Sequence, residues 1–224
     1  MLKAQKAVWF EKIFAVYNRN LFKRQFHSLN VSGLDVLQKR DKKIPLIIYA
    51  NHSSWWDGLI AFEISRIAKL DGFVMMEEKH LKKLFLFRRL GAFSVVRENP
   101  RAAIKSINYA AEILVETSNR TLWIFPQGEI LHNDLRPLKF YNGLTRIIEK
   151  IGQCYAAPVA MRYEFLTDYK PKVFVQIGKV DLFFGNENFK RRKIINILEL
   201  KLTETLNALK CDIQNKNFTK FEKV

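Results

Sequence analysis

Short hydrophobic runs separated by polar and glycine-containing turns recur along the chain. Runs of this length that are rich in β-branched and aromatic side chains are typical of buried strands. The pattern predicts strands at 45–50, 72–76, 91–97, 121–124, 156–160 and 172–180. A proline begins the first of these strands, and the last one alternates apolar and polar residues as a half-buried strand does.

Longer segments between these strands place apolar residues at helical spacing. They predict helices at 55–69, 100–117, 144–151 and 189–210. Asn99 is the expected N-cap of the second helix, with Pro100 in its first turn, and Gly152 ends the third. Ser53 and Ser54 can cap the first helix. Because strands alternate with helices, we expect an α/β fold in which a mixed, largely parallel sheet is flanked by helices.

The first 26 residues combine aromatic and aliphatic side chains with basic ones. The basic residues among them are Lys3, Lys6, Lys12, Arg19, Lys23 and Arg24. No uncharged run reaches the ~20 apolar residues that a transmembrane helix needs, and no cleavage site of a signal peptide follows. We therefore expect an N-terminal amphipathic helix that lies on an anionic membrane surface. The alternative is a helix that packs its apolar stripe against the core.

The charge of the chain also indicates an anionic partner. Thirty-eight Lys and Arg residues stand against 22 Asp and Glu, so the formal net charge is +16. Nucleic acid, an anionic membrane surface or a phosphate-rich carrier could each explain this charge. No helix-turn-helix, zinc-finger or RNA-binding signature accompanies it, so we expect no nucleic acid as partner.

Composition indicates one globular domain, since 48% of the residues are hydrophobic and no flexible linker divides them. We divide the chain into an amphipathic basic membrane-associating segment at 1–30, a main domain at 31–211, and a polar, frayed tail at 212–224. Cys154 and Cys211 do not make a disulfide framework, and no Cys/His cluster has metal-ligand spacing. We therefore expect no metal site and a location at the cytoplasmic face of the membrane, as a peripheral protein.

The most informative polar residues directly follow the first predicted strand. His52 lies where that strand ends, and Asp57 lies about one helical turn further on. Open α/β sheets form ligand crevices at the carboxyl ends of their strands. An imidazole oriented there by a carboxylate can take a proton from a substrate hydroxyl at neutral pH. The alternative is a strand-end histidine bonded to backbone and an ordinary first-turn acid.

Three further segments with notable residues lie in or directly after other predicted strands. The second strand-end turn is Phe125-Pro126-Gln127-Gly128-Glu129, in which the proline and glycine allow the backbone to approach a ligand. Between this turn and His52, the segment 91–97 ends in Arg97. A proline, Pro158, lies inside the strand predicted at 156–160.

With these four segments, the chain resembles the glycerolipid acyltransferase family, whose best-known members acylate lysophosphatidate. The N-H-x-x-x-x-D block runs from Asn51 to Asp57, and the G-x-x-x-x-x-R block ends at Arg97. The F-P-E-G-T-R block falls at 125–130, and the proline-containing strand at Pro158. The resemblance implies an enzyme that transfers an acyl group from acyl coenzyme A or an acyl carrier protein to a lipid hydroxyl, without a bound cofactor. His52 is its implied base and Asp57 the orienting acid.

The third block departs from the family pattern. Gln127, Glu129 and Ile130 stand where the family usually has glutamate, threonine and arginine. The family arginine is implied to help hold the acceptor phosphate, which Ile130 cannot do. Arg136 is a candidate substitute nearby. A carboxylate such as Glu129 suits sugar or glycerol hydroxyls, so a glycosylated lipid is an alternative acceptor.

The remaining roles follow from the proposed chemistry. The backbone around Gly128 is the candidate donor to the oxyanion, and Arg97 is the candidate grip for an anionic headgroup. The basic aromatic patch at 79–89 either continues the membrane face or lines a groove for an acyl chain. Ser53 and Ser54 lack the G-x-S-x-G elbow of a nucleophile. A non-catalytic membrane adaptor on the same fold is the competing interpretation.

Overall fold

The computed structural model describes residues 1–117, 119–185 and 190–224. The strands within these ranges form one nine-stranded sheet in the order β4-β3-β5-β2-β6-β7-β1-β9, and β8 pairs with β6 outside this path. The strands are β1 (Ser28–Ser32), β2 (Leu46–Ala50), β3 (Asp71–Glu77), β4 (Ala92–Val95), β5 (Arg120–Ile124), β6 (Gln153–Glu164), β7 (Lys172–Ile177), β8 (Asp181–Phe184) and β9 (Glu222–Lys223).

Most neighbouring strands run parallel. The parallel pairs are β4–β3, β3–β5, β5–β2, β2–β6 and β7–β1, and the antiparallel pairs are β6–β7, β6–β8 and β1–β9. Parallel neighbours need crossover connections, which helices supply here. The expectation of a mixed, largely parallel α/β sheet flanked by helices is therefore confirmed.

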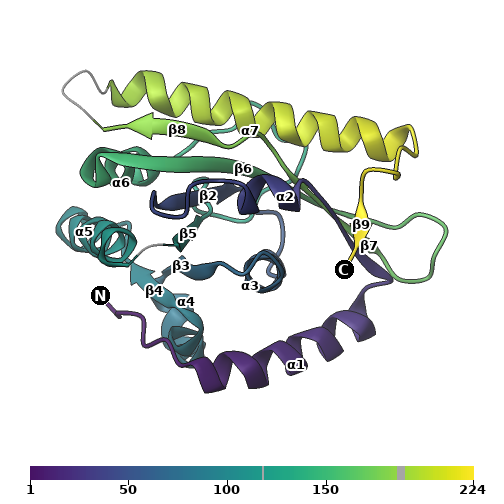
Figure 1. The fold of residues 1–224 in the computed structure, drawn as a ribbon, viewed down its shortest axis with the longest axis horizontal. Coiled ribbons are helices and arrows are strands. Elements are labelled where there is room, and N and C mark those ends of the chain that lie inside the picture. Colours follow the sequence, from purple (N-terminus) through teal and green to yellow (C-terminus); the bar gives the residue numbers. More distant parts are fainter. Residues whose placement is uncertain (118, 186–189) are drawn as a thin grey trace.

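Helices cover both faces of the sheet (Figure 1). They are α1 (Val8–Gln25), α2 (Leu34–Gln38), α3 (Asp57–Ile67), α4 (Glu78–Lys83), the 3-10 helix η1 (Phe85–Leu90), α5 (Pro100–Glu116), α6 (Gly143–Ile151) and α7 (Arg191–Gln214). Buried side chains of α5, α6 and α7 pack on one face, and those of α1, α2 and α3 pack on the other.

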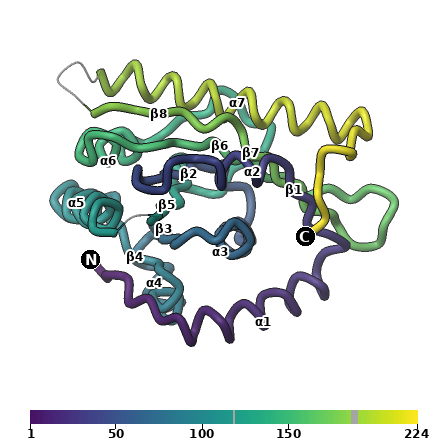
Figure 2. The backbone as a smooth tube through the Cα atoms, viewed as in Figure 1, coloured from purple at the N-terminus to yellow at the C-terminus, as the bar shows by residue number. Residues whose placement is uncertain are grey.

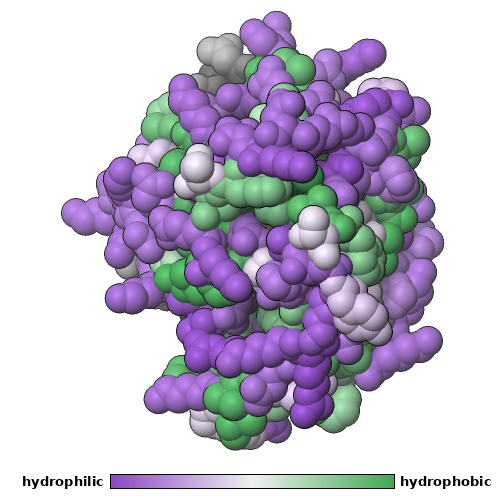
Figure 3. Space-filling model, turned by 90° about the vertical axis from the view of Figure 1, so that its right-hand side faces the viewer, coloured by the Kyte–Doolittle hydropathy of each residue, from purple (hydrophilic) through white to green (hydrophobic). Residues whose placement is uncertain are grey.

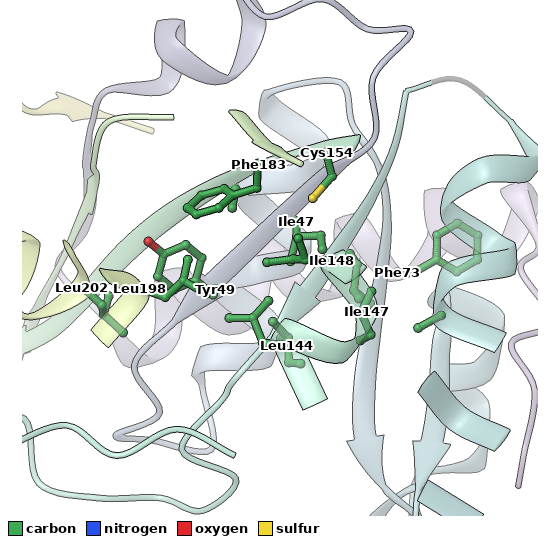
Figure 4. Close-up of a cluster of buried hydrophobic side chains, with 14 of the residues drawn as sticks. Ile47, Tyr49, Phe73, Leu144, Ile147, Ile148, Cys154, Phe183, Leu198 and Leu202 are labelled. Carbon is green, nitrogen blue, oxygen red and sulfur yellow. The ribbon is translucent and has the colours of Figure 1, made fainter. Parts of the chain in front are cut away.

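Strand β2 lies inside the sheet and contributes to both cores. Ile47 and Tyr49 point to the side of α6 and α7, while Leu46, Ile48 and Ala50 point to the side of α1 and α3. All five are fully buried, as expected of a strand covered on both faces. Figure 4 shows Tyr49 beside Phe183 of β8 and the leucines of α7, so the segment before His52 is held rigidly.

Several predicted elements have different ends in the structure. The helix predicted at 55–69 is α3, which begins at Asp57, and neither serine caps it, because its N-cap residue is Trp56. The strand predicted at 172–180 ends at Ile177 and is followed by β8, which the periodicity did not separate. The helix predicted at 189–210 is α7, which continues to Gln214, and position 189 lies outside the described residues.

The second helix is confirmed in detail. Helix α5 spans Pro100–Glu116, and the side chain of Asn99 accepts a hydrogen bond from the Ala102 N–H, 3.0 Å away. Gly152 follows α6 with a φ of 82°, a conformation that glycine adopts without strain.

Helix α1 runs along the lower edge of the molecule in the view of Figure 2. It carries apolar residues on two sides. Phe14 and Phe22 are buried against the core that α3 shares, whereas Trp9, Ile13 and Val16 are 56%, 61% and 64% exposed. One side therefore packs against the core, and the other stays open to solvent. Figure 3 shows hydrophobic and hydrophilic atoms mixed at the lower end of the molecule, where α1 lies. No helix within the described ranges is long and apolar enough to cross a membrane.

The two ends of the main domain are built differently from the predicted division. Strand β1 runs through the boundary placed between residues 30 and 31, and pairs with β7. The C-terminal residues are not frayed, since β9 pairs with β1 and Phe218 stacks on Phe174, with ring centroids 5.3 Å apart. This return of the chain was not predicted because the tail is polar on average and its contacts depend on Phe218 and Phe221.

Candidate functional site

Parallel pairing of β2 with β5 brings the first and third sequence blocks together. Ile47 lies opposite Leu122, and Tyr49 lies opposite Ile124, so both strands end at the same edge of the sheet. The turns that follow them, 51–56 and 125–129, are therefore neighbours at the carboxyl edge, where α/β sheets form ligand crevices.

His52 and Asp57 form a hydrogen-bonded pair at this edge. The imidazole Nδ1 of His52 lies 2.8 Å from Oδ2 of Asp57. The Asp57 side chain is fully buried, and the His52 side chain is 23% exposed. With Nδ1 bonded to the carboxylate, Nε2 is the ring nitrogen left for a substrate proton. The acid therefore fixes the tautomer that a general base needs.

The Asp57 carboxylate receives further hydrogen bonds from the turn that leads into α3. Its Oδ2 accepts the backbone N–H groups of Ser53 and Ser54, at 2.7 and 2.9 Å. The other oxygen, Oδ1, accepts the hydroxyl of Tyr163 at 2.5 Å. Burial and the charge of Asp57 raise the pKa of Tyr163 well above its ordinary value, so the hydroxyl remains a donor. Tyr163 was not predicted from the sequence, because it lies beyond the segment around Pro158.

The turn after β5 holds the backbone and the ring of His52. Gln127 is buried, and its Oε1 accepts the His52 backbone N–H at 3.2 Å. Phe125 stacks on the imidazole with a centroid distance of 4.7 Å and an interplanar angle of 29°. The His52 carbonyl accepts the Leu131 N–H at 2.8 Å. Three residues of one loop therefore determine the position of this histidine.

A cavity of about 1640 Å³ opens beside His52. It runs from the turn at Gly128 past β3 and α3 to the inner side of α1. Its lining is mostly apolar and includes the side chains of Phe14, Phe62, Val74, Met76, Phe87 and Leu90. The volume exceeds the roughly 300–1,000 Å³ of common small-molecule pockets. Such a space has room for a long apolar ligand, and His52 is among the residues that line it.

Arg97 lies on the wall of this cavity. Its Nη2 is 3.4 Å from Oε2 of Glu77, and its guanidinium is 5.4 Å from the centroid of the Tyr141 ring. Lys79 also pairs with Glu77, at 2.9 Å. Burial raises the pKa of Glu77, but the Lys79 hydrogen bond and the Arg97 charge outweigh it, so its pKa lies below the ordinary value. Cations thus outnumber acids in this cluster on the cavity wall.

These blocks also match a family model described as Acyltransferase, over residues 28–162. The match covers more than half of the 224 residues. The chain belongs to the acyltransferase family. The match does not select the glycerolipid subtype within the family.

Other comparisons add no functional information to this acyltransferase. No curated protein matches the chain significantly. A solved structure titled "Crystal Structure of the Pilus Retraction Motor PilT and Bound ADP" aligns with 11% identity and a TM-score of 0.30. The alignment covers 81% of this chain, which spans 56% of that chain. A TM-score this low supports no argument about fold or function.

Some residues that the sequence analysis assigned to the acyltransferase site lie elsewhere. The Arg136 guanidinium donates to the carbonyls of Asn133 and Leu135 and to Oδ1 of Asn207, and the residue does not line the cavity. Arg136 is therefore not placed to replace the family arginine. Pro158 is buried within β6, next to β2, and does not line the cavity either.

The third block contributes to the site in a different way than expected. Phe125, Pro126 and Glu129 line the cavity, whereas Gln127 points at the His52 backbone instead. The Gly128 N–H donates to the Phe125 carbonyl at 3.0 Å and closes the turn. Within the backbone around Gly128, which the sequence suggested as the oxyanion donor, the Gly128 N–H itself is thus already bonded.

Proposed function

We propose that this acyltransferase moves a fatty acyl group from a thioester, acyl coenzyme A or an acyl carrier protein, to a hydroxyl of lysophosphatidate or a related lipid. The observation that carries the proposal is the 2.8 Å contact between His52 Nδ1 and Asp57 Oδ2 beside a long apolar cavity. A base and an apolar channel at one sheet edge are what direct acyl transfer to a hydroxyl requires.

The chemistry needs no protein nucleophile. His52 Nε2 accepts the proton of the acceptor hydroxyl while its oxygen attacks the thioester carbonyl. The tetrahedral intermediate then collapses, the C–S bond breaks, and the imidazolium returns the proton to the leaving thiolate. Asp57 stabilises the imidazolium that forms between these steps. A general base in this position contributes roughly 10²- to 10⁴-fold to the rate.

Charge at the cavity wall supports an anionic acceptor. Arg97 and Lys79 line the cavity and both pair with Glu77, so two cations face one acid in this cluster. Cations so placed favour a phosphate group. The observation that favours the alternative, a glycosylated lipid, is Glu129, an exposed carboxylate on the same cavity, which the exposed ring of Tyr141 also lines.

The outer side of α1 supports action at a membrane surface, with the protein peripheral on the cytoplasmic face. Exposed Trp9, Ile13 and Tyr17 project from α1, and Phe85 and Leu86 are exposed on η1, which packs beside it. The exposed basic residues Lys12, Arg19, Lys82 and Lys83 accompany them. Aromatic residues among cations are typical of helices that lie in the interface of an anionic bilayer.

The test is the release of free thiol from acyl coenzyme A and from acyl carrier protein, with a panel of acceptors in mixed vesicles. The panel holds lysophosphatidate, a zwitterionic lysophospholipid, a glycosylated lipid and no acceptor. We expect thiol release that depends on the acceptor, with the acyl product identified by mass spectrometry. Release without an acceptor would indicate a thioesterase, and no release with any of them would favour the non-catalytic adaptor.

A further inference from the structure

The two oxygens of Asp57 are held by different parts of the fold. Oδ2 accepts hydrogen bonds from His52 Nδ1 and from two backbone N–H groups of the turn that follows β2. Oδ1 accepts the Tyr163 hydroxyl, which comes from β6. Two separate elements of the fold therefore donate hydrogen bonds to the two oxygens of one carboxylate. That carboxylate is fully buried.

Strand β6 reaches this carboxylate because it is longer than its parallel neighbour β2. The β2–β6 pairing ends at Ala50 and Val159. Beyond that point the Asn51 side chain continues the ladder, accepting the Met161 N–H at 2.8 Å and donating to the Met161 carbonyl at 3.0 Å. Tyr163, two residues further on, lies on the same side of the strand as Met161. Asn51 thus aligns the extension of β6 against the turn that carries His52.

We propose that Tyr163 is a positioning residue, whose hydroxyl fixes the rotation of the Asp57 carboxylate and so keeps His52 in the tautomer with Nε2 free. This inference rests on the proposed function for its kinetic consequence only. The arrangement of the three side chains can be tested without any activity.

The physical reason lies in what Oδ1 would face without the hydroxyl. A buried carboxylate oxygen that loses its donor bears the full desolvation penalty of a charged group. Rotation about Cβ–Cγ, or uptake of a proton, would relieve that penalty. Either change weakens the contact between Oδ2 and His52 Nδ1. The raised pKa of Tyr163 agrees with a hydroxyl that stays protonated against the acid.

The Tyr163 ring is packed independently of its hydroxyl. Its centroid is 5.9 Å from that of Phe26, which in turn contacts Trp56 at 4.9 Å. Tyr163→Phe therefore keeps this aromatic cluster and removes only the donor. The matched control is Tyr155→Phe, on the same strand but opposite Leu46, at the far end of β2.

The experiment uses the full chain with ¹⁵N-labelled histidine, of which there are four residues. His52 signals are assigned with His52→Gln. In the unmodified protein and in Tyr155→Phe we expect the Nδ1–H tautomer of His52, with its Nδ1 proton protected from exchange. In Tyr163→Phe we expect a mixture of tautomers and faster exchange. Where an acceptor is turned over, kcat should fall about 10- to 100-fold, as for a lost hydrogen bond to a charged group, with KM unchanged.

An unchanged His52 tautomer and exchange rate in a folded Tyr163→Phe protein would overturn the proposal. If activity is absent from every variant while the tautomer shifts as expected, only the proposed function fails. Should Tyr163→Phe not fold, the exchange of tyrosine hydroxyl protons is measured instead, in the unmodified protein with tyrosine labelled with ¹³C at Cζ. One slowly exchanging hydroxyl, assigned to Tyr163 by its contacts with Phe26, supports the proposal, and rapid exchange of the Tyr163 hydroxyl contradicts it.

Discussion

The ring of Phe125 stacks on the imidazole of His52, with centroids 4.7 Å apart. The two residues are 73 positions apart, and they meet because β2 and β5 are parallel neighbours. The same loop supplies Gln127, whose Oε1 accepts a hydrogen bond from the His52 backbone N–H. The third sequence block therefore supports His52, the proposed general base, in addition to lining the cavity.

Replacing Phe125 with alanine should remove the flat support of the imidazole. Aromatic pairs contribute about 0.5–1.5 kcal/mol beyond their buried area. We expect kcat to fall about 2- to 10-fold, while Phe125→Tyr retains most activity. Steady-state kinetics with the best acceptor of the panel measure both. An equal loss in the two variants would show that stacking is not the reason.

Position 128 requires glycine because of its backbone conformation and because neighbouring side chains leave no room for a Cβ atom. Its φ is +75°, and a Cβ there would meet Nη1 of Arg97 and approach Tyr141 Cε2 to 2.8 Å. Gly128→Ala should lower the free energy of unfolding by roughly 1–2 kcal/mol and displace Arg97. Gly143→Ala is the control, since nothing lies within 4 Å of its Cβ position. Urea unfolding compares the two, and equal stability would contradict the prediction.

Arg97 distinguishes the candidate acceptors. If the acceptor carries a phosphate, Arg97→Gln should raise its KM about tenfold or more, because charge-assisted hydrogen bonds contribute roughly 1.5–3 kcal/mol. With a glycosylated acceptor the KM should change little. Arg101→Gln, at the exposed start of α5, controls for overall charge. An unchanged KM for lysophosphatidate would exclude Arg97 as the phosphate ligand.

The exposed side of α1 should determine binding to vesicles. Burying a large apolar side chain contributes about 1.5–3 kcal/mol, so Trp9→Ser and Ile13→Ser should each weaken partitioning about tenfold or more. Val115→Ser removes an equally exposed apolar residue from α5. Sedimentation with anionic vesicles, in low and high salt, tests this. Equal losses in all three variants would mean that α1 is not the membrane face.

Burial of Cys154 predicts the pH dependence of stability on the alkaline side. Burial raises the pKa of its thiol from 9.0 to about 12. Between these values the unfolded chain releases a proton that the folded protein keeps, so stability is full below pH 9 and declines as the pH rises. The slope for this group is about 1 kcal/mol per pH unit. Cys154→Ala should show a shallower decline than the unmodified protein in urea unfolding at pH 9–11, and an identical slope would contradict the assignment.

The sequence predicted the parts of this molecule that depend on local pattern. The strand before His52, the Asn99 cap of α5 and the end of α6 at Gly152 all follow from neighbouring residues. The motif spacing also predicted that His52 and Asp57 would lie close together, because it places Asp57 about one helical turn after the strand end.

The rest depends on contacts between distant segments. Tyr163 reaches Asp57 only because β6 extends beyond the end of β2. The length of a strand relative to its neighbour cannot be predicted from a single sequence. Arg136 appeared close in sequence, yet its loop turns it toward Asn207 of α7. The burial of only one side of α1 likewise follows from where α3 and η1 lie, which hydrophobic periodicity does not specify.

The most direct test of the account is the rate of acceptor-dependent thiol release by His52→Ala, in protein shown by circular dichroism and vesicle binding to be folded and membrane-competent. If the imidazole is the general base, the rate with the best acceptor should fall about 10²- to 10⁴-fold. A rate within twofold of the unmodified protein would contradict the central claim, whatever the identity of the acceptor.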